Sequence, residues 1–594
     1  MTRPTQSHAD THSKTRRLNG QFYTPSPIAR NMIAQVLQAR PEQDLADITI
    51  LDPSCGDGAF VLAAFDALTN SQAPPHAERS DAAIRLIKHS LFGVDLDVAA
   101  LNRLRDRLAQ RADVTLDQRP RLEAVLHANF RCGNALTGSG LAGRPGHGEV
   151  ATDGIAWSAD FRKIADRGGF DVIVGNPPYH RELSAKSLFD QVAKSELGRR
   201  WRQSRMDYWF YFLHRGLDLL QPNGHLSFIV NSYWVGSRGA QKLIRRLQQE
   251  TTIEQMTMLG NQHVFSGVSG RHMILQLRRG RETSDCQILD LTRTSVGTTP
   301  LRVRQSDLYL NDRLLTTGKR PRLSQVPGKT PLEQRFQVRQ GMAENPPTVS
   351  RHHLPQLETP AAVGEGVFVL RAEEIAALDL RGAEAQCLRP YYYPRDITRY
   401  HLPPHDGTCV LYLDGKTETD LDGNTRILQH LSRFRPLMEA RRETRQGRIP
   451  WWQLHWPRRA ELFVQPRILC RQMSQQPSFV YVERPTFVGF AVHILTAAPP
   501  QSELPLTALT GILNSRLAHD WFEILAKRRG VRLEISGELL RQFPLPPEDS
   551  DQAAALAALV LQRQEAAEPD AAASEPTQVL EEHIEQLVRN WYGV

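Results

Sequence analysis

The chain has 594 residues and a formal net charge of +8, with 40% hydrophobic and 23% charged residues. At about 100–200 residues per domain, this length predicts two or three domains, and the composition excludes wholesale disorder and collagen-like repeats. No apolar run approaches the roughly 20 residues of a membrane span, and the first residues lack an apolar secretory core. Six cysteines without a CxxC pair argue against a zinc cluster or a disulfide framework, and they fit a reducing, cytoplasmic location.

The charge is unevenly distributed along the chain. From Glu548 to the end there are ten acidic residues against Arg563 and Arg589, a net of −8, so the first 547 residues carry +16. A body this basic is typical of a protein that binds a polyanion. Many basic proteins bind no nucleic acid, however, so the charge alone leaves both interpretations open.

Residues 18–280 repeat a pattern of short apolar strand, glycine-containing turn and helix. The apolar runs are Ile48–Leu51, Leu91–Val94, Asp171–Val174, Leu226–Val230 and Met273–Leu277. This alternation is typical of a mainly parallel sheet covered by helices, and the last two runs allow an antiparallel strand at the edge. We therefore predict an α/β fold, with a first domain over residues 1–285.

After about residue 283 proline becomes frequent, and arginine-rich and aromatic patches interrupt the apolar segments. We predict a second domain of mixed α+β structure over residues 286–547 and an acidic helical tail over residues 548–594. The tail contains an Ala/Leu-rich helix, the segment EAAEPDAAASEP with the composition of a disordered linker, and a final amphipathic helix near Val579–Trp591.

The first apolar run leads into the segment Asp52-Pro53-Ser54-Cys55-Gly56-Asp57-Gly58-Ala59-Phe60. Glycines directly after a strand let the backbone approach a ligand closely, because no Cβ stands in the way. The segment lacks the spacing of a dinucleotide site or a phosphate loop. The segment therefore has two interpretations. It either binds a ligand that has no phosphate at this turn, or it is a tight turn without a ligand.

Two polar residues follow the next strands. Asp95 ends the second apolar run, where a carboxylate accepts hydrogen bonds from the hydroxyls of a ribose, and we predict that Asp97 caps the following helix. Asn134, in Gly133-Asn134, is predicted at the same edge of the sheet, where an amide can hydrogen-bond an adenine ring. A turn asparagine without a ligand is the default interpretation of Asn134.

The fourth segment ends an apolar strand with Gly175-Asn176-Pro177-Pro178-Tyr179. Two consecutive prolines remove backbone donors, so the side-chain oxygen of Asn176 and the carbonyl of Pro177 form a pair of acceptors. Such a pair suits a planar –NH2 group, whose two hydrogens both need acceptors, and Tyr179 can stack on a flat ring. A proline-rich turn without a ligand is the alternative.

In this order the segments resemble the gamma-class adenine-N6 DNA methyltransferases of restriction–modification systems. Members of that family carry a Thr-Pro helix, DPxCGxGxF, GxD/E and NPPY ahead of a separate target-recognition domain. The match runs from about Gly20 to Leu277 and includes Phe22-Tyr23-Thr24-Pro25. The resemblance implies a Rossmann-like methyltransferase fold, S-adenosylmethionine as the cofactor and no metal. It also implies double-stranded DNA as the partner.

The resemblance further implies which residues bind the cofactor. Its methionine part is expected at Thr24 and at the loop residues Asp52, Cys55, Gly56, Gly58 and Phe60, its ribose at Asp95 and its adenine at Asn134. Asn176 is expected to touch the cofactor as well as the target base.

For catalysis, the resemblance implies that a flipped-out adenine is received by Asn176, Pro177, Pro178 and Tyr179. Phe265, in Val264-Phe265-Ser266, is expected on the other side of the base, with core packing as an equal alternative. With about 20 residues ahead of Phe22, a fused nuclease is not expected there, which leaves room for a separately encoded restriction endonuclease as a partner.

The second domain resembles the target-recognition domains of the same family less distinctly. Arginine alternates with aromatic residues in Arg389–Asp396 and Arg441–Trp456, and Lys527-Arg528-Arg529 adds a basic run. The predicted activity is site-specific methylation of adenine N6 in duplex DNA. Methylation of a protein glutamine amide or of an RNA base uses the same site chemistry, and a non-catalytic DNA-binding specificity protein is a third alternative.

Overall fold

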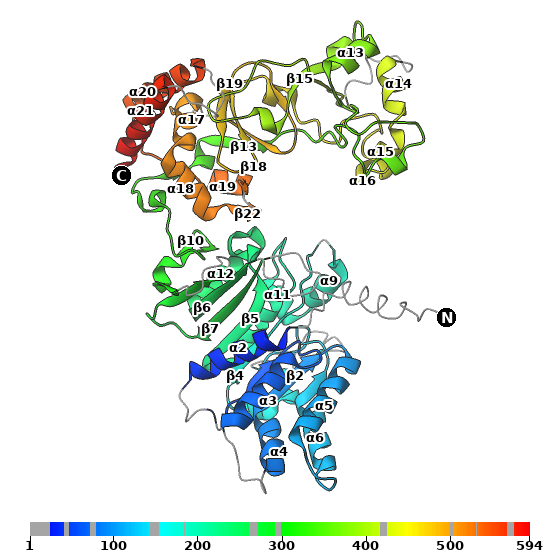
Figure 1. Cartoon of the computed structure of the whole chain (residues 1–594), viewed down its shortest axis with the longest axis vertical. Coiled ribbons are helices and arrows are strands. Elements are labelled where there is room, and N and C mark those ends of the chain that lie inside the picture. Colours follow the sequence, from blue (N-terminus) through cyan, green and yellow to red (C-terminus); the bar gives the residue numbers. More distant parts are fainter. Residues whose placement is uncertain are drawn as a thin grey trace, which may run out of the picture. The chain divides into compact units, whose positions relative to one another are not determined.

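The computed structural model describes residues 24–40, 45, 47–71, 79–141, 154–182, 184–260, 271–291, 299–415, 425–498, 503–529, 532–566 and 575–594. The chain divides into two compact units, Met1–Lys319 and Arg320–Val594, each with its own layers of strands and helices (Figure 1). In the described part of the chain, no helix is long and apolar enough to cross a membrane.

The first unit is built on a nine-stranded sheet within the described residues. Its strand order is β3 (Phe130–Cys132), β2 (Leu91–Asp95), β1 (Ile50–Asp52), β4 (Phe170–Gly175), β5 (Leu220–Asn231), β7 (His272–Arg279), β6 (Thr251–Gly260), β8 (Cys286–Asp290) and β9 (Leu301–Val303). Strands β3 to β5 in this order are parallel, and β7 is antiparallel to both of its neighbours. The chain winds in opposite directions from β1 and β4, and in such sheets ligands bind at the carboxyl ends beside this switch point.

Helices cover both faces of this sheet. Successive strand residues point to opposite faces, and both sets are buried and hydrophobic. Ile50 and Val172 belong to one hydrophobic core, whereas their neighbours Leu51 and Ile173 belong to the other. The first core is covered by α2 (Ser26–Gln38), α3 (Ala59–Ser71), α4 (Arg79–Ser90), α5 (Val98–Ala112) and α6 (Arg119–Asn129). The second is covered by α7 (Trp157–Asp160), α8 (Arg162–Asp166), α9 (Lys186–Lys194), α10 (Glu196–Trp201), α11 (Trp209–Leu219) and α12 (Gln241–Glu250).

The predicted α/β fold with a mainly parallel sheet is confirmed. The predicted position of the antiparallel strand is wrong, since β7 lies inside the sheet between β5 and β6. The sequence pattern does not predict β6, because its residues TTIEQMTMLG mix polar and apolar side chains. Residues 286–319 lie in the first unit, where β8 and β9 extend the sheet and β10 (Tyr309–Leu310) pairs with β11 (Arg313–Leu314). The domain limits at 285 and 547 remain predictions.

The second unit has the mixed α+β structure expected from the sequence. One antiparallel sheet has the order β13 (Phe336–Gln340), β21 (Val492–Ala497), β17 (Arg467–Arg471) and β19 (Phe479–Val482); another has the order β14 (Val369–Leu370), β16 (Cys409–Leu411), β15 (Leu388–Tyr392) and β20 (Phe487–Val488), with β15 and β20 parallel. Smaller sheets pair β12 (Thr330–Pro331) with β24 (Pro544–Leu545), and β18 (Met473–Ser474) and β22 (Lys527–Arg529) with β23 (Arg532–Glu534). The helices are α13 (Ala372–Leu378), α14 (Arg426–Ser432), α15 (Arg435–Glu439), α16 (Arg442–Arg445), α17 (Leu506–Asn514), α18 (Arg516–Leu525) and α19 (Gly537–Arg541).

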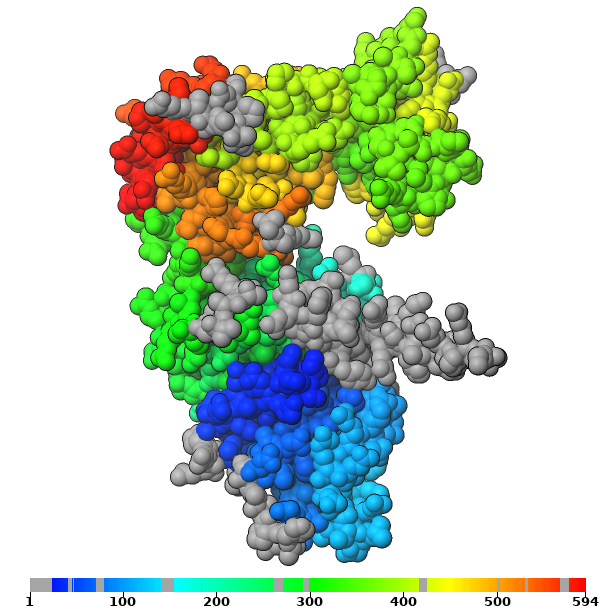
Figure 2. All heavy atoms as spheres, viewed as in Figure 1, coloured from blue at the N-terminus to red at the C-terminus, as the bar shows by residue number. Residues whose placement is uncertain are grey.

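Two further helices, α20 (Ser550–Glu565) and α21 (Glu575–Tyr592), form the acidic C-terminal tail and confirm the helices predicted there. They pack on the rest of the second unit, where the red atoms of the tail lie beside the orange atoms that include α17 (Figure 2). A Cβ on Gly511 of α17 would lie 2.9 Å from Val560 of α20, so a glycine permits this close approach. At the end of α21, Tyr592 donates to the carbonyl of Pro544 at 2.7 Å.

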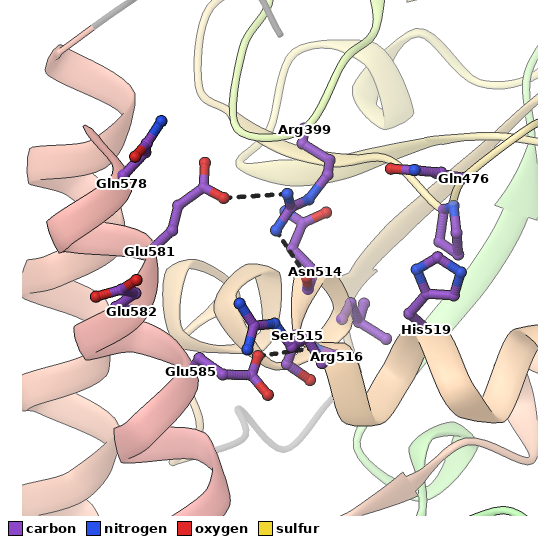
Figure 3. A pocket seen from close by; sticks show the side chains of 12 residues that line it. Arg399, Gln476, Asn514, Ser515, Arg516, His519, Gln578, Glu581, Glu582 and Glu585 are labelled. Carbon is purple, nitrogen blue, oxygen red and sulfur yellow. Dashed lines mark hydrogen bonds and ion pairs between the residues drawn. The ribbon is translucent and has the colours of Figure 1, made fainter. Parts of the chain in front are cut away.

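Opposite charges join α21 to the rest of the unit around a cavity of about 330 Å3. Glu581 accepts from Arg399 at 3.1 Å, and Glu585 accepts from the backbone nitrogen of Arg516 at 2.8 Å (Figure 3). Glu581 also accepts from Arg563 at 2.9 Å. The side chain of Arg563 is only 2% exposed. Its charge is therefore buried with Glu581 as its carboxylate partner among the described residues.

We predict that Glu581→Ala lowers the stability of the second unit by about 3 kcal/mol, because it leaves the buried charge of Arg563 without its carboxylate. Differential scanning calorimetry measures this as a lower melting temperature. The matched control is Glu582→Ala, since Glu582 is the neighbouring exposed glutamate of the same helix. Equal melting temperatures for the two variants contradict the prediction.

Candidate functional site

The loop after β1 is a turn that requires its glycines. The backbone nitrogen of Cys55 donates to the carbonyl of Val94 in β2 at 3.0 Å, and that of Gly58 donates to the carbonyl of Cys55 at 2.8 Å. Gly56 and Gly58 have φ angles of +51° and +91°, which side-chain-bearing residues rarely adopt. A Cβ on Gly58 would lie 2.1 Å from Leu104 Cδ1, whereas a Cβ on Gly56 would have no atom of the described residues within 4 Å, its two sequence neighbours apart. The loop is thus packed against α5 on one side and open at Gly56.

Asp95, the last residue of β2, ties this loop to the second strand. Its carboxylate accepts from the backbone nitrogen of Gly56 at 2.7 Å and from that of Asp97 at 2.9 Å. Burial raises the pKa of Asp95 in spite of these bonds. The prediction that Asp97 caps the next helix is confirmed, because its side chain accepts from the nitrogens of Ala99 and Ala100.

A second carboxyl group, Asp52, lies where β1 meets β4. It is 2% exposed and accepts from the backbone nitrogen of Ser54 at 3.0 Å. Burial raises its pKa to about 8 and the charge of Asp95 adds to the rise, against the bond from Ser54. A Cβ on Gly175, at the end of β4, would lie 2.9 Å from Asp52 Oδ1. The loops after β1 and β4 therefore start side by side.

The thiol of Cys55 is 4% exposed. Burial raises its pKa well above the ordinary value, and the charges of Asp52 and Asp95 raise it further. Cys55 therefore stays protonated and is not a nucleophile.

The segment after β4 holds its tyrosine through the hydroxyl group. The hydroxyl oxygen of Tyr179 lies 2.7 Å from Asn176 Oδ1 and 2.8 Å from the carbonyl oxygen of Ile229 in β5. Its ring centre lies 5.8 Å from that of His272, with a tilt of 45°. Burial raises the pKa of Tyr179 well above its ordinary value, so the hydroxyl keeps the proton that it donates. Asn176 is half-buried beside it.

The other predicted cofactor residues lie in three different environments. Asn134 follows β3 next to Asp95, since the nitrogen of Gly133 donates to the Asp95 carbonyl at 3.0 Å. Its own side-chain oxygen accepts from the nitrogen of Leu136 at 3.0 Å, as in an asparagine turn. Phe60 is 2% exposed and packs in the core, and Thr24 is buried ahead of α2. Phe265 lies outside the described residues, so its role stays a prediction.

Sequence reasoning misses a group of polar side chains beside Tyr179. Arg181 forms a backbone bridge with Asp207, and Tyr233 follows the end of β5. The order of the strands is the signal that could have identified this group. Strand β5 is parallel to β4 and next to it, so the carboxyl ends of both strands lie at the same edge of the sheet. Among the described residues, no group of three or more His, Cys, Asp or Glu side chains is placed to hold a metal ion.

Three protein-family models match the chain. The N-6 DNA Methylase model matches residues 7–103, the Eco57I restriction-modification methylase model residues 89–265, and the TaqI-like C-terminal specificity domain model residues 429–545. The first two matches together span residues 7–265, over which the chain is similar to the N6 DNA methylases of restriction–modification systems. The specificity-domain match lies in the second unit, where the sequence predicts the C-terminal recognition domain.

Individual relatives match parts of the chain. It is 26% identical over 149 residues to the type II methyltransferase M.HincII of Haemophilus influenzae, across 24% of this chain and 29% of that protein. It is 22% identical over 278 residues to the type II restriction enzyme and methyltransferase RM.Eco57I of Escherichia coli, across 42% of this chain and 27% of that protein. The alignments thus span less than a third of either relative.

Among solved structures, the type IIL restriction-modification enzyme MmeI in complex with DNA has a similar fold. The TM-score is 0.61 at 14% sequence identity, and the likeness covers 99% of this chain and 75% of MmeI. A DrdV–DNA complex gives a TM-score of 0.50 at 12% identity, over 96% of this chain and 61% of that one. These likenesses show the fold of the chain.

The buried carboxyl of Asp52 predicts a pH-dependent stability. With a folded pKa of about 8, Asp52 stays protonated between pH 4 and 8, whereas the unfolded chain releases the proton near pH 4. The wild type therefore loses up to about 1.4 kcal/mol of stability per pH unit across this window. Asp52→Asn keeps an oxygen acceptor for Ser54 and has no proton to lose.

We expect the melting temperature of Asp52→Asn to rise relative to that of the wild type as the pH increases from 5 to 8. Scanning calorimetry of both proteins, without cofactor, measures the difference. A constant difference across this range means that Asp52 titrates normally.

Proposed function

We propose that this protein is a site-specific DNA methyltransferase that transfers the methyl group of S-adenosylmethionine to N6 of adenine in duplex DNA, as the modification component of a restriction–modification system. The observation that carries the proposal is the approach of Gly175 to Asp52, which brings a glycine loop and the Asn-Pro-Pro-Tyr segment to one edge of the sheet. The three family matches support it.

The residues present fit S-adenosylmethionine. The open space at Gly56 lets the main chain approach a ligand, and the carboxylate of Asp95 keeps lone pairs for ribose hydroxyls beyond its two backbone bonds. We assign the methionine part to Thr24, Asp52, Cys55, Gly56 and Gly58. Phe60 then acts from the core by fixing the start of α3, and Asn134 lies beside the adenine.

The cofactor supplies a methyl group that is already activated on a sulfonium, so the protein's task is alignment. Asn176 Oδ1 and the carbonyl of Pro177 accept the two hydrogens of the adenine amino group and leave its nitrogen lone pair for the methyl carbon. Pro178 keeps this turn rigid. Once methylated, the nitrogen would carry an extra proton, which Asn176 Oδ1 and the Pro177 carbonyl would hold by hydrogen bonds until it passes to water.

An adenine within a duplex cannot reach these acceptors, so the base must rotate out of the helix, at a cost of a few kcal/mol. We assign Tyr179 to stack on this base, with Phe265 as its proposed counterpart on the other side. The hydroxyl of Tyr179 lies within hydrogen-bonding distance of Asn176 Oδ1 and of the Ile229 carbonyl, and donation to either acceptor fixes the ring of Tyr179 before the base arrives.

The alternatives differ in their substrate. Methylation of a protein glutamine amide or an RNA base uses the same acceptor pair, but the TaqI-like specificity domain at residues 429–545 favours DNA. A non-catalytic specificity protein has no need of an intact acceptor pair beside an open glycine loop. A separately encoded endonuclease remains the proposed partner.

We predict that Asn176→Ala abolishes methyl transfer and leaves cofactor binding largely intact. The test is nucleoside mass spectrometry of unmethylated duplex DNA after incubation with S-adenosylmethionine and either protein. New N6-methyladenine from the wild type alone supports the proposal. Methylation by the variant removes Asn176 from its role, and no methylated base from the wild type points to RNA, a protein amide or a required partner.

Asp95→Ala is expected to weaken cofactor binding, but the same change removes the acceptor for Gly56 and loosens the loop. We therefore pair it with Asp95→Asn, which keeps one oxygen acceptor and loses the charge. We expect at least tenfold weaker binding of S-adenosylmethionine by both variants in calorimetric titration, which is about 1.4 kcal/mol. Unchanged affinity in Asp95→Asn assigns Asp95 to the loop alone.

A further inference from the structure

A polar cluster of Arg181, Asp207, Asn231 and Tyr233 lies beside the Asn-Pro-Pro-Tyr segment, and the proposed transfer does not use it. The backbone of Arg181 forms an antiparallel bridge with Asp207. Asn231 ends β5, the strand next to β4, and Tyr233 follows two residues later. The cluster therefore forms where the chain leaves the carboxyl ends of these two strands.

Asp207 is the buried centre of this cluster, with 9% of its surface exposed. Asn231 Nδ2 donates to its carboxylate at 3.4 Å, and side-chain hydrogen bonds join Tyr233 to both Asp207 and Arg181. Burial raises the pKa of Asp207 in spite of these bonds and the charge of Arg181. The carboxyl group of Asp207 thus hydrogen-bonds Tyr233 without forming a close ion pair with Arg181.

The guanidinium of Arg181 is held in place but not neutralised. It lies 5.4 Å from the ring centre of Tyr233 and hydrogen-bonds the hydroxyl of that residue. Arg181 is exposed, and no carboxylate among the described residues forms an ion pair with it. Tyr233 is itself 39% exposed. An arginine oriented in this way presents its remaining N–H donors and its full charge, which match a phosphate group.

We propose that Arg181 binds the DNA phosphate beside the flipped-out nucleotide and that Tyr233 is the residue that positions Arg181 for this contact. The inference rests on the proposed function. Arg181 follows Tyr179 by two residues, at most about 7 Å of extended chain, so a base stacked on Tyr179 brings its own sugar and phosphate towards Arg181. That phosphate moves into place only when the nucleotide rotates out of the helix. The contact therefore stabilises the flipped state.

The test compares DNA binding with and without flipping. The target sequence is first mapped from the methylated positions of plasmid DNA treated with the wild type. Binding of an end-labelled duplex with this sequence, and of one with the target adenine pair replaced by a guanine–cytosine pair, is then measured by fluorescence anisotropy from 50 to 200 mM salt, a range across which phosphate contacts weaken measurably.

We expect Arg181→Ala to bind the target duplex about tenfold more weakly, the loss of one charge-assisted hydrogen bond. The slope of log Kd against log salt concentration falls by about 0.9, as expected for one phosphate contact. On the duplex without the target adenine, Arg181→Ala and the wild type have the same Kd and the same slope. Arg181→Lys restores the slope, and Tyr233→Phe keeps the slope but raises KM and lowers the single-turnover rate.

The matched control is Arg111→Ala. Arg111 lies in the last turn of α5 and forms an exposed ion pair with Asp66, so this variant also removes one arginine charge. Melting temperatures check that each variant folds, and Arg181→Gln replaces Arg181→Ala if the smaller side chain destabilises the unit. The inference is overturned if the slope for Arg181→Ala is unchanged on the target duplex, or if the slope falls equally on both duplexes. Methylation of plasmid DNA by the wild type would in that case still support the proposed function. Absence of methylation by the wild type instead overturns the proposed function.

Discussion

The site depends on the close approach of Asp52 to Gly175. Only a residue without a side chain fits at Gly175, because a Cβ there would lie 2.9 Å from the carboxyl oxygen of Asp52. This contact joins the ends of β1 and β4, from which the chain winds in opposite directions. The glycine loop and the Asn-Pro-Pro-Tyr segment therefore begin next to each other. The cost is a carboxyl group buried so deeply that its pKa rises to about 8.

Hydrogen bonds within the site prepare it for ligands instead of leaving its side chains to find their own positions. Asp95 holds the nitrogen of Gly56, and the hydroxyl of Tyr179 lies within bonding distance of both Asn176 and Ile229. A hydroxyl has one proton, so it cannot serve both acceptors fully at once. When the amino group of adenine reaches Asn176, the proton of Tyr179 can turn to the carbonyl of Ile229 without movement of the ring.

In the C-terminal tail, the net charge counted from the sequence differs from the charge that is left unpaired at the surface. Two of its glutamates are not free surface charges, because Glu581 pairs with Arg399 and Arg563 and Glu585 accepts from the backbone of Arg516. The tail therefore neutralises part of the positive charge of its own unit and buries Arg563. Arg181 is the opposite case, an arginine held by a tyrosine while its charge stays exposed.

The sequence by itself determined the α/β class, the glycine turn, the acceptor segment and the cap at Asp97, because each depends on residues close together in the chain. Only the tertiary structure placed β7 inside the sheet, put β8 and β9 in the first unit and packed the tail on the second. It also placed Arg181 beside Asp207 and Tyr233. These contacts join residues that are far apart in the sequence. They depend on strand pairing and burial across the whole unit, so no local sequence pattern predicts them.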